Sequence, residues 1–288
     1  MTRSVEILVP GPLTTLQDRG RIGHLAVGVG RAGAADLGSY LLGGRLLGNA
    51  DGAAALEVTF GGLRLRASGD LLICLTGAST PAEVNGRPVP RAALFEVRDG
   101  QELSLGMPLA GLRTYVSVRG GFTGPEVLGS VSFDTMSGLG AEPVKAGQVV
   151  PVGTRTVGFP VVDVAGVAEP PTGLVDLEVR PGPRLDWFAH PERLAQTPWQ
   201  VSSRSDRKGI RLEGEPLERV PELVEAELQS EGMVRGAIQV PPNGQPVIFL
   251  SDHPVTGGYP VIGVLRPAAV DRAAQLQPGQ AVRLRWDN

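Results

Sequence analysis

Short runs of alternating apolar and polar residues recur along the chain and predict β-strands. Three pairs of runs flank a two-residue turn signal and predict hairpins, at Gly61-Gly62, Asn85-Gly86 and Asn243-Gly244. Glycine and asparagine supply the positive φ that such turns need. The further predicted strands are Val5–Val9, Leu71–Thr76, Ala93–Val97, Glu102–Leu105, Arg113–Val118, Asp176–Val179, Val261–Leu265 and Ala281–Arg285.

Helical periodicity is confined to three segments: residues 34–47, a short turn at "HPERLAQ", and "PAAVDRAAQL" after Pro267. These segments do not alternate with strands in the βαβ rhythm of a parallel sheet. The pattern therefore predicts a mainly β protein with a few short helices.

The length of 288 residues favours two compact units. Between Val157 and Leu174 the chain contains "AEPPTG", which has the composition of a linker. We place the boundary there and expect two β-barrel-like domains in tandem, over residues 1–168 and 169–288.

Composition indicates a globular protein, with 42% hydrophobic residues, 20% charged residues and a net charge of -3. Arginines are scattered among acids instead of forming a basic stripe, so nucleic acid is not an expected partner. No apolar run is long enough to span a bilayer, and the first residues lack the pattern of a signal peptide. We expect a cytoplasmic protein without a membrane partner.

Metal and nucleophile motifs are weakly supported. The three histidines, His24, His190 and His253, lack ligand spacing, so no metal is expected. Cys74 lies in the apolar run "LLICLTG" and is expected to be buried. "GVGRAG" matches the glycine spacing of a dinucleotide fingerprint, but the hairpins downstream of it favour a simple loop.

Two polar clusters sit in turns where sites are commonly built. One holds Asp18, Arg19 and Arg21, and the other, "SSRSDRKGIRLEG", holds Arg204, Asp206, Arg207 and Lys208. Guanidinium groups suit planar carboxylates and phosphates. The alternative is that these are turn residues with solvated ion pairs, worth about 0–1 kcal/mol each.

Several long motifs occur together and in order along nearly the whole chain. They include "GPLTTLQDRGRIGH", "LLGNADGAAALEVTFGG", "GLRTYVSVRGGF", "VRPGPRLDWF", "SSRSDRKGIRLEG", "SEGMVRGAIQVPPNGQPVIFLSD" and "TGGYPVIGVL". Together they resemble the KipA-like family, which includes the C subunit of 5-oxoprolinase, allophanate hydrolase subunit 2 and part of the carboxyltransferase region of urea carboxylase.

The resemblance implies two tandem cyclophilin-like β-barrels. It also implies a subunit of an ATP-dependent complex that opens 5-oxo-L-proline to L-glutamate, working with a KipI-like subunit and a third subunit. ATP is then expected at the level of the complex, a small amide is the substrate, and this chain alone is catalytically incomplete.

Loop chemistry and motif position together suggest the site residues. The expected catalytic residues are Asp206, Asp252 and Tyr259. The expected substrate-binding residues are Arg19, Arg204, Arg207, Gln239, Thr256, Gly257 and Gly258. Developing oxyanions and planar anions need donors of this kind.

The chain departs from the usual family motif "DRQTTGGYPKI" at four positions, His253, Pro254, Val255 and Val261. Val131 and Met136 also stand where the family commonly has arginine. These replacements remove cations and leave the identity of the substrate open.

Two other functions are compatible with the same resemblance. The first is a component of a biotin-dependent carboxyltransferase acting on a urea-like amide. Neither "PVKAG" nor "DRKGI" resembles a biotin acceptor, so no biotin is expected on this chain. The second is a non-catalytic, regulatory partner of a KipI-like protein.

Overall fold

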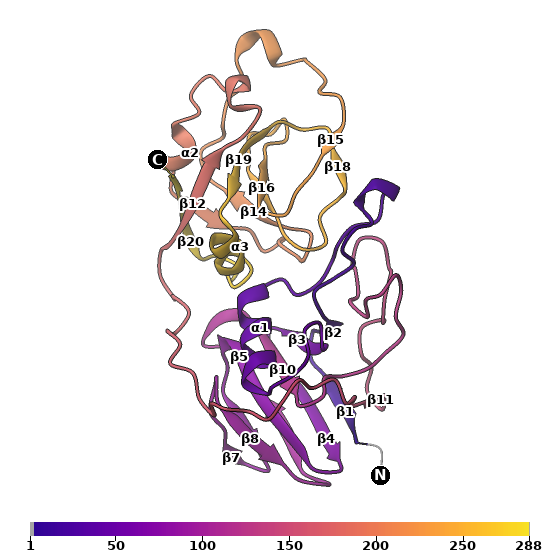
Figure 1. Cartoon of the computed structure of the whole chain (residues 1–288). Helices are drawn as coiled ribbons and strands as arrows, with labels where there is room; N and C mark the ends of the chain where they lie inside the picture. The colour runs from indigo at the N-terminus through magenta and orange to yellow at the C-terminus, as the bar shows by residue number, and fades with distance from the viewer. Residues whose placement is uncertain (1–2, 288) are drawn as a thin grey trace. The chain divides into compact units, whose positions relative to one another are not determined.

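The computed structural model describes residues 3–287, which form two compact units (Figure 1). The first unit comprises the residues up to Ile22 together with Ala32–Pro170, and the second comprises Gly23–Arg31 and Pro171–Asn288. A single boundary near residue 168 would have kept Gly23–Arg31 in the first unit, whereas their contacts group them with the second.

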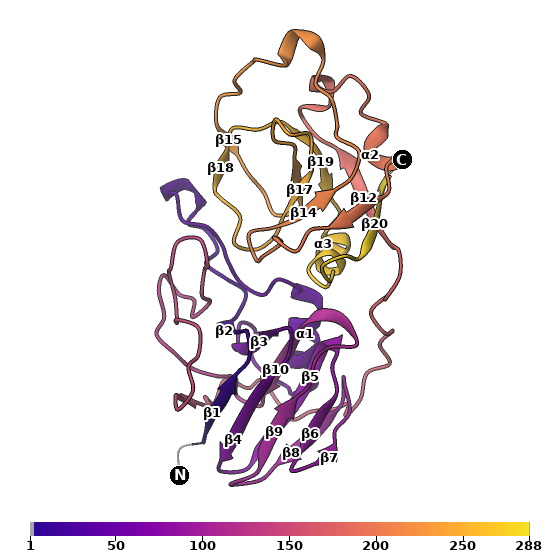
Figure 2. The same ribbon diagram turned by 180° about the vertical axis from the view of Figure 1, so that it is seen from behind.

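The first unit contains a six-stranded and a five-stranded sheet, in the orders β11-β1-β4-β9-β6-β7 and β2-β3-β10-β5-β8. Figure 2 shows β4, β9 and β6 side by side. The strands are β1 (Ser4–Pro10), β2 (Leu13–Gln17), β3 (Ala55–Thr59), β4 (Leu63–Ser68), β5 (Leu71–Ser79), β6 (Ala82–Val84), β7 (Arg87–Pro88), β8 (Leu94–Val97), β9 (Glu102–Leu105), β10 (Ala110–Val118) and β11 (Val149–Pro151).

Strand β4 shows how the sequence pattern produces one buried face. Leu63, Leu65 and Ala67 are buried, whereas Arg64 and Arg66 between them are exposed. Successive side chains of a strand point to opposite faces, so one face joins the apolar core and the other meets solvent. The core of the first unit is built from such faces of both sheets.

Helix α1 (Leu37–Leu46) packs against strands β5 and β10. A β-carbon on Gly43 would lie 2.6 Å from Ser117 Oγ on β10, so glycine allows the helix to approach the sheet closely. This contact accounts for a residue that is otherwise unfavourable inside a helix.

One of the predicted hairpins is wrong and two are confirmed. Gly61-Gly62 joins β3 to β4, which belong to different sheets, so the chain crosses between sheets at this turn. Asn85-Gly86 does connect the antiparallel strands β6 and β7, with φ of 47° and 78°. Asn243-Gly244 lies in the loop between two further antiparallel strands, Ala237–Gln239 and Val247–Phe249.

The second unit is a closed barrel with strand order β12-β19-β16-β17-β14-β13-β20 and a separate ribbon of β15 and β18. Strands β12 and β20 pair in parallel, whereas the other pairs are antiparallel. The strands are β12 (Val175–Pro181), β13 (Trp199–Val201), β14 (Gly209–Glu213), β15 (Glu231–Gly232), β16 (Ala237–Gln239), β17 (Val247–Phe249), β18 (Thr256–Gly257), β19 (Val261–Leu265) and β20 (Ala281–Trp286).

The remaining helices of the second unit are short. They are η1 (Leu25–Val27), η2 (Leu185–Trp187), α2 (Arg193–Gln196), η3 (Pro221–Leu223) and α3 (Pro267–Ala273). The prediction of a mainly β protein with three short helical segments is therefore confirmed. Over residues 3–287, no helix has the length and apolar character needed to cross a membrane.

Candidate functional site

Two neighbouring strands of the barrel position Arg207 and Asp252. Arg207 precedes β14 and Asp252 follows β17, and these strands pair with Gly209 opposite Phe249. Backbone hydrogen bonds continue beyond the ladder, from Leu250 N to Lys208 O at 3.0 Å and from Asp252 N to Arg207 O at 3.1 Å. The register of β14 and β17 therefore sets the two residues opposite each other.

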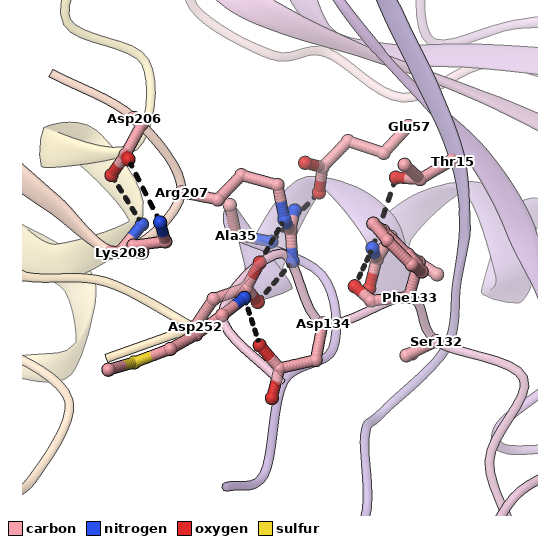
Figure 3. Close-up of polar contacts among 12 residues, drawn as sticks. Thr15, Ala35, Glu57, Ser132, Phe133, Asp134, Asp206, Arg207, Lys208 and Asp252 are labelled. Carbon is pink, nitrogen blue, oxygen red and sulfur yellow. Dashed lines mark hydrogen bonds and ion pairs between the residues drawn. The ribbon is translucent and has the colours of Figure 1, made fainter. Parts of the chain in front are cut away.

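The side chains of Arg207 and Asp252 form a buried ion pair with two parallel hydrogen bonds (Figure 3). Arg207 Nε donates to Asp252 Oδ2 at 2.9 Å, and Nη2 donates to Oδ1 at 3.0 Å. The two side chains are 1% and 0% exposed. Charge-assisted, bidentate contacts of this kind fix both position and direction, because the planar guanidinium matches the carboxylate. The pair is thus a rigid anchor at the start of the loop 251–260.

His253 follows this anchor and is also held in place. Its ring stacks on Phe249, with centroids 5.7 Å apart and an interplanar angle of 11°. Nδ1 lies 2.7 Å from the carbonyl oxygen of Pro254. A carbonyl oxygen only accepts hydrogen bonds, so Nδ1 carries the proton in this contact. The side chain that replaces the arginine of the usual motif is therefore a buried imidazole held by a stacking contact and a backbone contact.

The second half of the loop brings three predicted residues together. Gln239 Nε2 on β16 donates to the carbonyl oxygen of Tyr259 at 3.0 Å. A β-carbon on Gly257 would lie 2.6 Å from the same nitrogen, so a larger residue here would displace the Gln239 amide. Thr256 and Gly257 form β18, whose partner is β15. Gly258 has more space, with Leu228 O at 3.5 Å as the nearest atom to an added β-carbon.

Asp206 and Arg204 have surface contacts instead of joining the buried pair. The side chain of Asp206 is 54% exposed, and its Oδ1 accepts hydrogen bonds from the backbone nitrogens of Lys208 and Gly209 at 2.8 and 3.2 Å. Arg204 is 76% exposed and lies 3.5 Å from Glu213. Both fit the alternative of turn residues with solvated ion pairs. Asp206 and Arg204 therefore lie at a surface turn, and their expected catalytic and substrate-binding roles stay predictions.

Arg19 belongs to the first unit and forms an ion pair with Asp51 at the surface. Its neighbour Asp18 is nearly buried, and Asp18 Oδ1 accepts hydrogen bonds from Gly20 N, Ser130 Oγ and Ser132 Oγ at 2.6 to 2.7 Å. Asp18 therefore ties two loops together.

Val131 and Met136, which stand where the family commonly has arginine, differ in environment. The side chain of Val131 is buried in the apolar core of the first unit. Met136 is 52% exposed, and its backbone nitrogen donates to Asp134 Oδ1 at 2.8 Å. The loop carrying Met136 is ordered by the buried carboxylate of Asp134, which also accepts from Ser137 Oγ at 2.7 Å.

A buried polar cluster in the first unit was missed by the sequence analysis. Glu57 on β3 and Tyr115 on β10 are opposite each other in the ladder, and the tyrosine hydroxyl donates to Glu57 Oε2 at 2.8 Å. The same oxygen accepts from Ala35 N at 2.9 Å (Figure 3), and Arg113 Nε lies 3.5 Å from Glu57 Oε1. The signal was present in the sequence as charged residues inside the apolar strands "LEVTF" and "GLRTYVSV".

Burial raises the pKa of Tyr115 well above its usual value, and the negative charges of Glu57 and Asp36 add to the shift. The tyrosine hydroxyl therefore stays protonated and donates to Glu57 at neutral pH. The cluster presents a carboxylate, a guanidinium and a phenol within one buried region of the first unit.

The glycine-rich segment before α1 does not have the geometry of a phosphate-binding turn. The segment before it contains the 3-10 turn η1 instead of a strand. The N-terminus of α1 is capped by the carboxylate of Asp36, which accepts from Ser39 N at 2.9 Å. A carboxylate already occupies the place where a helix N-terminus would meet a phosphate. Among residues 3–287 no group of three or more acidic, histidine or cysteine side chains is arranged to hold a metal ion.

The family model for the carboxyltransferase domain, subdomain A and B, matches residues 27–286. The chain belongs to this family. It is also 35% identical over 283 residues to the C subunit of 5-oxoprolinase from Escherichia coli, covering 96% of this chain and 89% of that protein. These two matches confirm the family resemblance that the sequence motifs indicate.

Two solved structures share the fold of this chain. TTHA0988 superposes with a TM-score of 0.87 at 29% identity, covering 99% of this chain and 55% of that one. The K. lactis urea amidolyase superposes with a TM-score of 0.91 at 28% identity, covering 98% of this chain. This chain spans about half of TTHA0988 and 18% of the urea amidolyase, so both larger proteins contain further regions.

Proposed function

We propose that this chain is a subunit of an ATP-dependent 5-oxoprolinase complex, which hydrolyses 5-oxo-L-proline to L-glutamate together with a KipI-like subunit and a third subunit. The observation that carries the proposal is the 35% identity to the C subunit of E. coli 5-oxoprolinase along nearly the full length of both chains. A relative that is named as a subunit also supports a requirement for partner chains.

The chemistry of the reaction explains why a rigid loop with many donors suits this role. Transfer of the ATP γ-phosphoryl group to the amide oxygen releases ADP and activates the lactam carbonyl carbon. Water attacks that carbon and the C–N bond breaks, which gives glutamyl phosphate. A second water hydrolyses this acyl phosphate to glutamate and phosphate, so one ATP and two water molecules are consumed. Donors fixed in position stabilise the developing oxyanion without reorganisation.

The loop 251–260 is the part of this chain to which we assign the substrate. The Arg207–Asp252 pair anchors its beginning, and Gln239 holds its end through the carbonyl of Tyr259. We propose Arg207 and Asp252 as positioning residues, because each already holds the other in two hydrogen bonds. The backbone of Thr256, Gly257 and Gly258 and the side chain of Tyr259 then provide the substrate contacts.

The test is reconstitution of the complex. The purified chain is mixed with its KipI-like and third partner subunits, and 5-oxoproline-dependent release of ADP and glutamate is measured. We expect turnover only when all three subunits are present. Replacing Asp252 by asparagine should lower turnover, whereas replacing the exposed Arg204 by glutamine should leave it nearly unchanged. Turnover that does not depend on 5-oxoproline would refute the proposal.

A second candidate is a biotin-dependent carboxyltransferase component, favoured by the family description and by the TM-score of 0.91 to a urea amidolyase. The two lysines of the chain, Lys145 and Lys208, lie near Glu142 and Asp206 at the surface. Neither lysine lies in a segment that resembles a biotin acceptor, so carboxybiotin would be delivered by another protein. Binding to a biotinylated carrier and carboxylation of urea would support this function, and absence of both would remove it.

The third candidate, a regulatory partner of a KipI-like protein, makes a different prediction. The complex with that protein would form, would survive replacement of Asp252 by asparagine, and would show no turnover in any combination of subunits and substrates.

A further inference from the structure

The second unit contains an open cavity of about 930 Å³ beside the end of the loop 251–260. Its walls come from three segments, drawn from residues 216–228, 241–244 and 258–259. Four prolines and the side chains of Leu217, Val224 and Tyr259 supply the apolar part of its lining. We call this cavity the proline groove. A volume of this size is at the upper end of the range for small-ligand pockets, about 300–1,000 Å³.

Three carboxylates, Glu218, Glu225 and Glu227, line the proline groove. Within residues 3–287 these three carboxylates form no ion pair, whereas acids elsewhere on the same unit do. Glu231, for example, is paired with Arg184, and Asp176 with Arg283. The groove thus carries negative charge that the described part of the chain does not compensate by salt bridges.

Arg219 is the one basic residue among the described residues that line the groove. Its Nη1 donates to the carbonyl oxygens of Leu223, Val224 and Ala226 at 3.3 to 3.4 Å. Its guanidinium also lies 5.6 Å from the centre of the Trp187 ring. Through these contacts, Arg219 holds the wall formed by residues 223–226 in place. A single cation opposite three carboxylates leaves the groove acidic.

Tyr259 adds an aromatic surface to this acidic groove. The residue is 44% exposed, and the hydrogen bond from Gln239 to its carbonyl fixes the backbone. Aromatic faces and carboxylates both favour arginine and lysine side chains, the former through cation–π contacts. Apolar walls between the charged positions favour aliphatic side chains.

We propose that the proline groove docks an extended, basic segment of a partner protein chain, with apolar side chains between its arginines or lysines. The acidic and aromatic lining complements a basic segment, and a volume at the upper end of the small-ligand range suits a stretch of chain better than one small cation. Relatives named as subunits supply the context in which such a partner exists. The proposal does not depend on which reaction the complex performs.

The probe is a panel of fluorescein-labelled nine-residue peptides in which arginine alternates with proline and leucine at varied spacing. Matched peptides carry citrulline in place of arginine. Binding to the full chain is measured by anisotropy and calorimetry. We expect saturable binding that weakens with salt, and at least about tenfold weaker binding of the citrulline peptides.

The test variant is the double substitution Glu225→Gln with Glu227→Gln, which should weaken binding about tenfold. The control is Glu222→Gln, which removes one negative charge, against two in the test variant, from the same segment at a residue outside the groove lining. It should change affinity less than about twofold. Thermal melts establish that the variants remain folded.

Three outcomes would overturn the proposal. The first is absence of binding by every peptide up to about 1 mM. The second is a loss of peptide affinity in Glu222→Gln equal to that in the double variant, which would show unspecific charge attraction. The third is saturable binding of agmatine at the groove with no gain from any peptide, which would identify a site for a small cation.

Discussion

Arg207 and Asp252 face each other as a buried, bidentate ion pair although 45 positions separate them in the sequence. Nothing in the local pattern distinguishes Arg207 from its neighbours Arg204 and Lys208, which are at the surface. The pair owes its geometry to the register between β14 and β17.

The buried pair should be sensitive to loss of one charge. We expect Asp252→Asn to lower the free energy of unfolding by about 3 kcal/mol, because a buried guanidinium then faces a neutral amide. Urea titration followed by circular dichroism measures the change. Asp206→Asn is the matched control, since that side chain is exposed and its Oδ1 acceptor is kept, and it should change stability by less than about 0.5 kcal/mol. Equal changes in unfolding free energy for the two variants would contradict the conclusion that Asp252 belongs to a buried ion pair and Asp206 does not.

The buried cluster of the first unit should depend on the hydroxyl of Tyr115. Removing it in Tyr115→Phe leaves Glu57 without one donor and Asp36 N without its acceptor. We expect a loss of about 1–3 kcal/mol in unfolding free energy. Tyr259→Phe serves as the control, because that side chain is partly exposed, and its effect should be close to zero. A Tyr115→Phe variant as stable as the parent would show that the cluster is not tightly coupled.

The adjacent glycines of the loop 251–260 should respond differently to alanine. Gly257→Ala places a β-carbon 2.6 Å from Gln239 Nε2 and should displace the hydrogen bond to Tyr259 O, at a cost of about 1–2 kcal/mol. Gly258→Ala meets its nearest atom at 3.5 Å and should be tolerated. Differential scanning calorimetry of the two variants, beside the parent, compares them directly. A larger loss of stability in Gly258→Ala than in Gly257→Ala would contradict this geometry.

Burial raises the pKa of the Cys74 thiol to about 12. A group whose pKa is higher in the folded than in the unfolded state stabilises the fold fully below the unfolded value, and this contribution falls as pH rises toward the folded value. The loss should therefore occur between about pH 9 and pH 12. Between pH 8 and pH 10, the free energy of unfolding of the parent should fall by about 1 kcal/mol more than that of Cys74→Ala. Because the tyrosines are common to both proteins, their titration cancels, and a constant difference would contradict the raised pKa.

Local sequence signals predicted the elements that depend on local chemistry. Alternation in "LRLRAS" identified a strand with one buried face, and Asn85-Gly86 identified a hairpin from the positive φ that its turn requires. The helical segment expected after Pro267 begins at that proline, whereas the segment expected from residue 34 begins at Leu37. Strand β2, "LTTLQ", was not predicted, because its polar threonines and glutamine resemble a loop although they are buried in the sheet.

The candidate site was predictable only in part. Arg207, Asp252, Gln239 and Gly257 were selected by motif position, and the structure pairs the first two and the last two. Asp206 was selected by the same reasoning, yet it caps a surface turn. Glu57 was not selected, although it is a buried polar residue. Its position as a carboxylate within an apolar strand could have been recognised from the sequence.

The sequence by itself determined the class of fold, most strand positions and the family, because these follow from periodicity, turn residues and long ordered motifs. Only the tertiary structure decided which strands pair and which charges are buried. Gly61-Gly62 has the local chemistry of a hairpin, but its two strands join different sheets. Whether a polar residue caps a turn or forms a buried pair depends on strand register, and register is set by packing between residues that are distant in the chain.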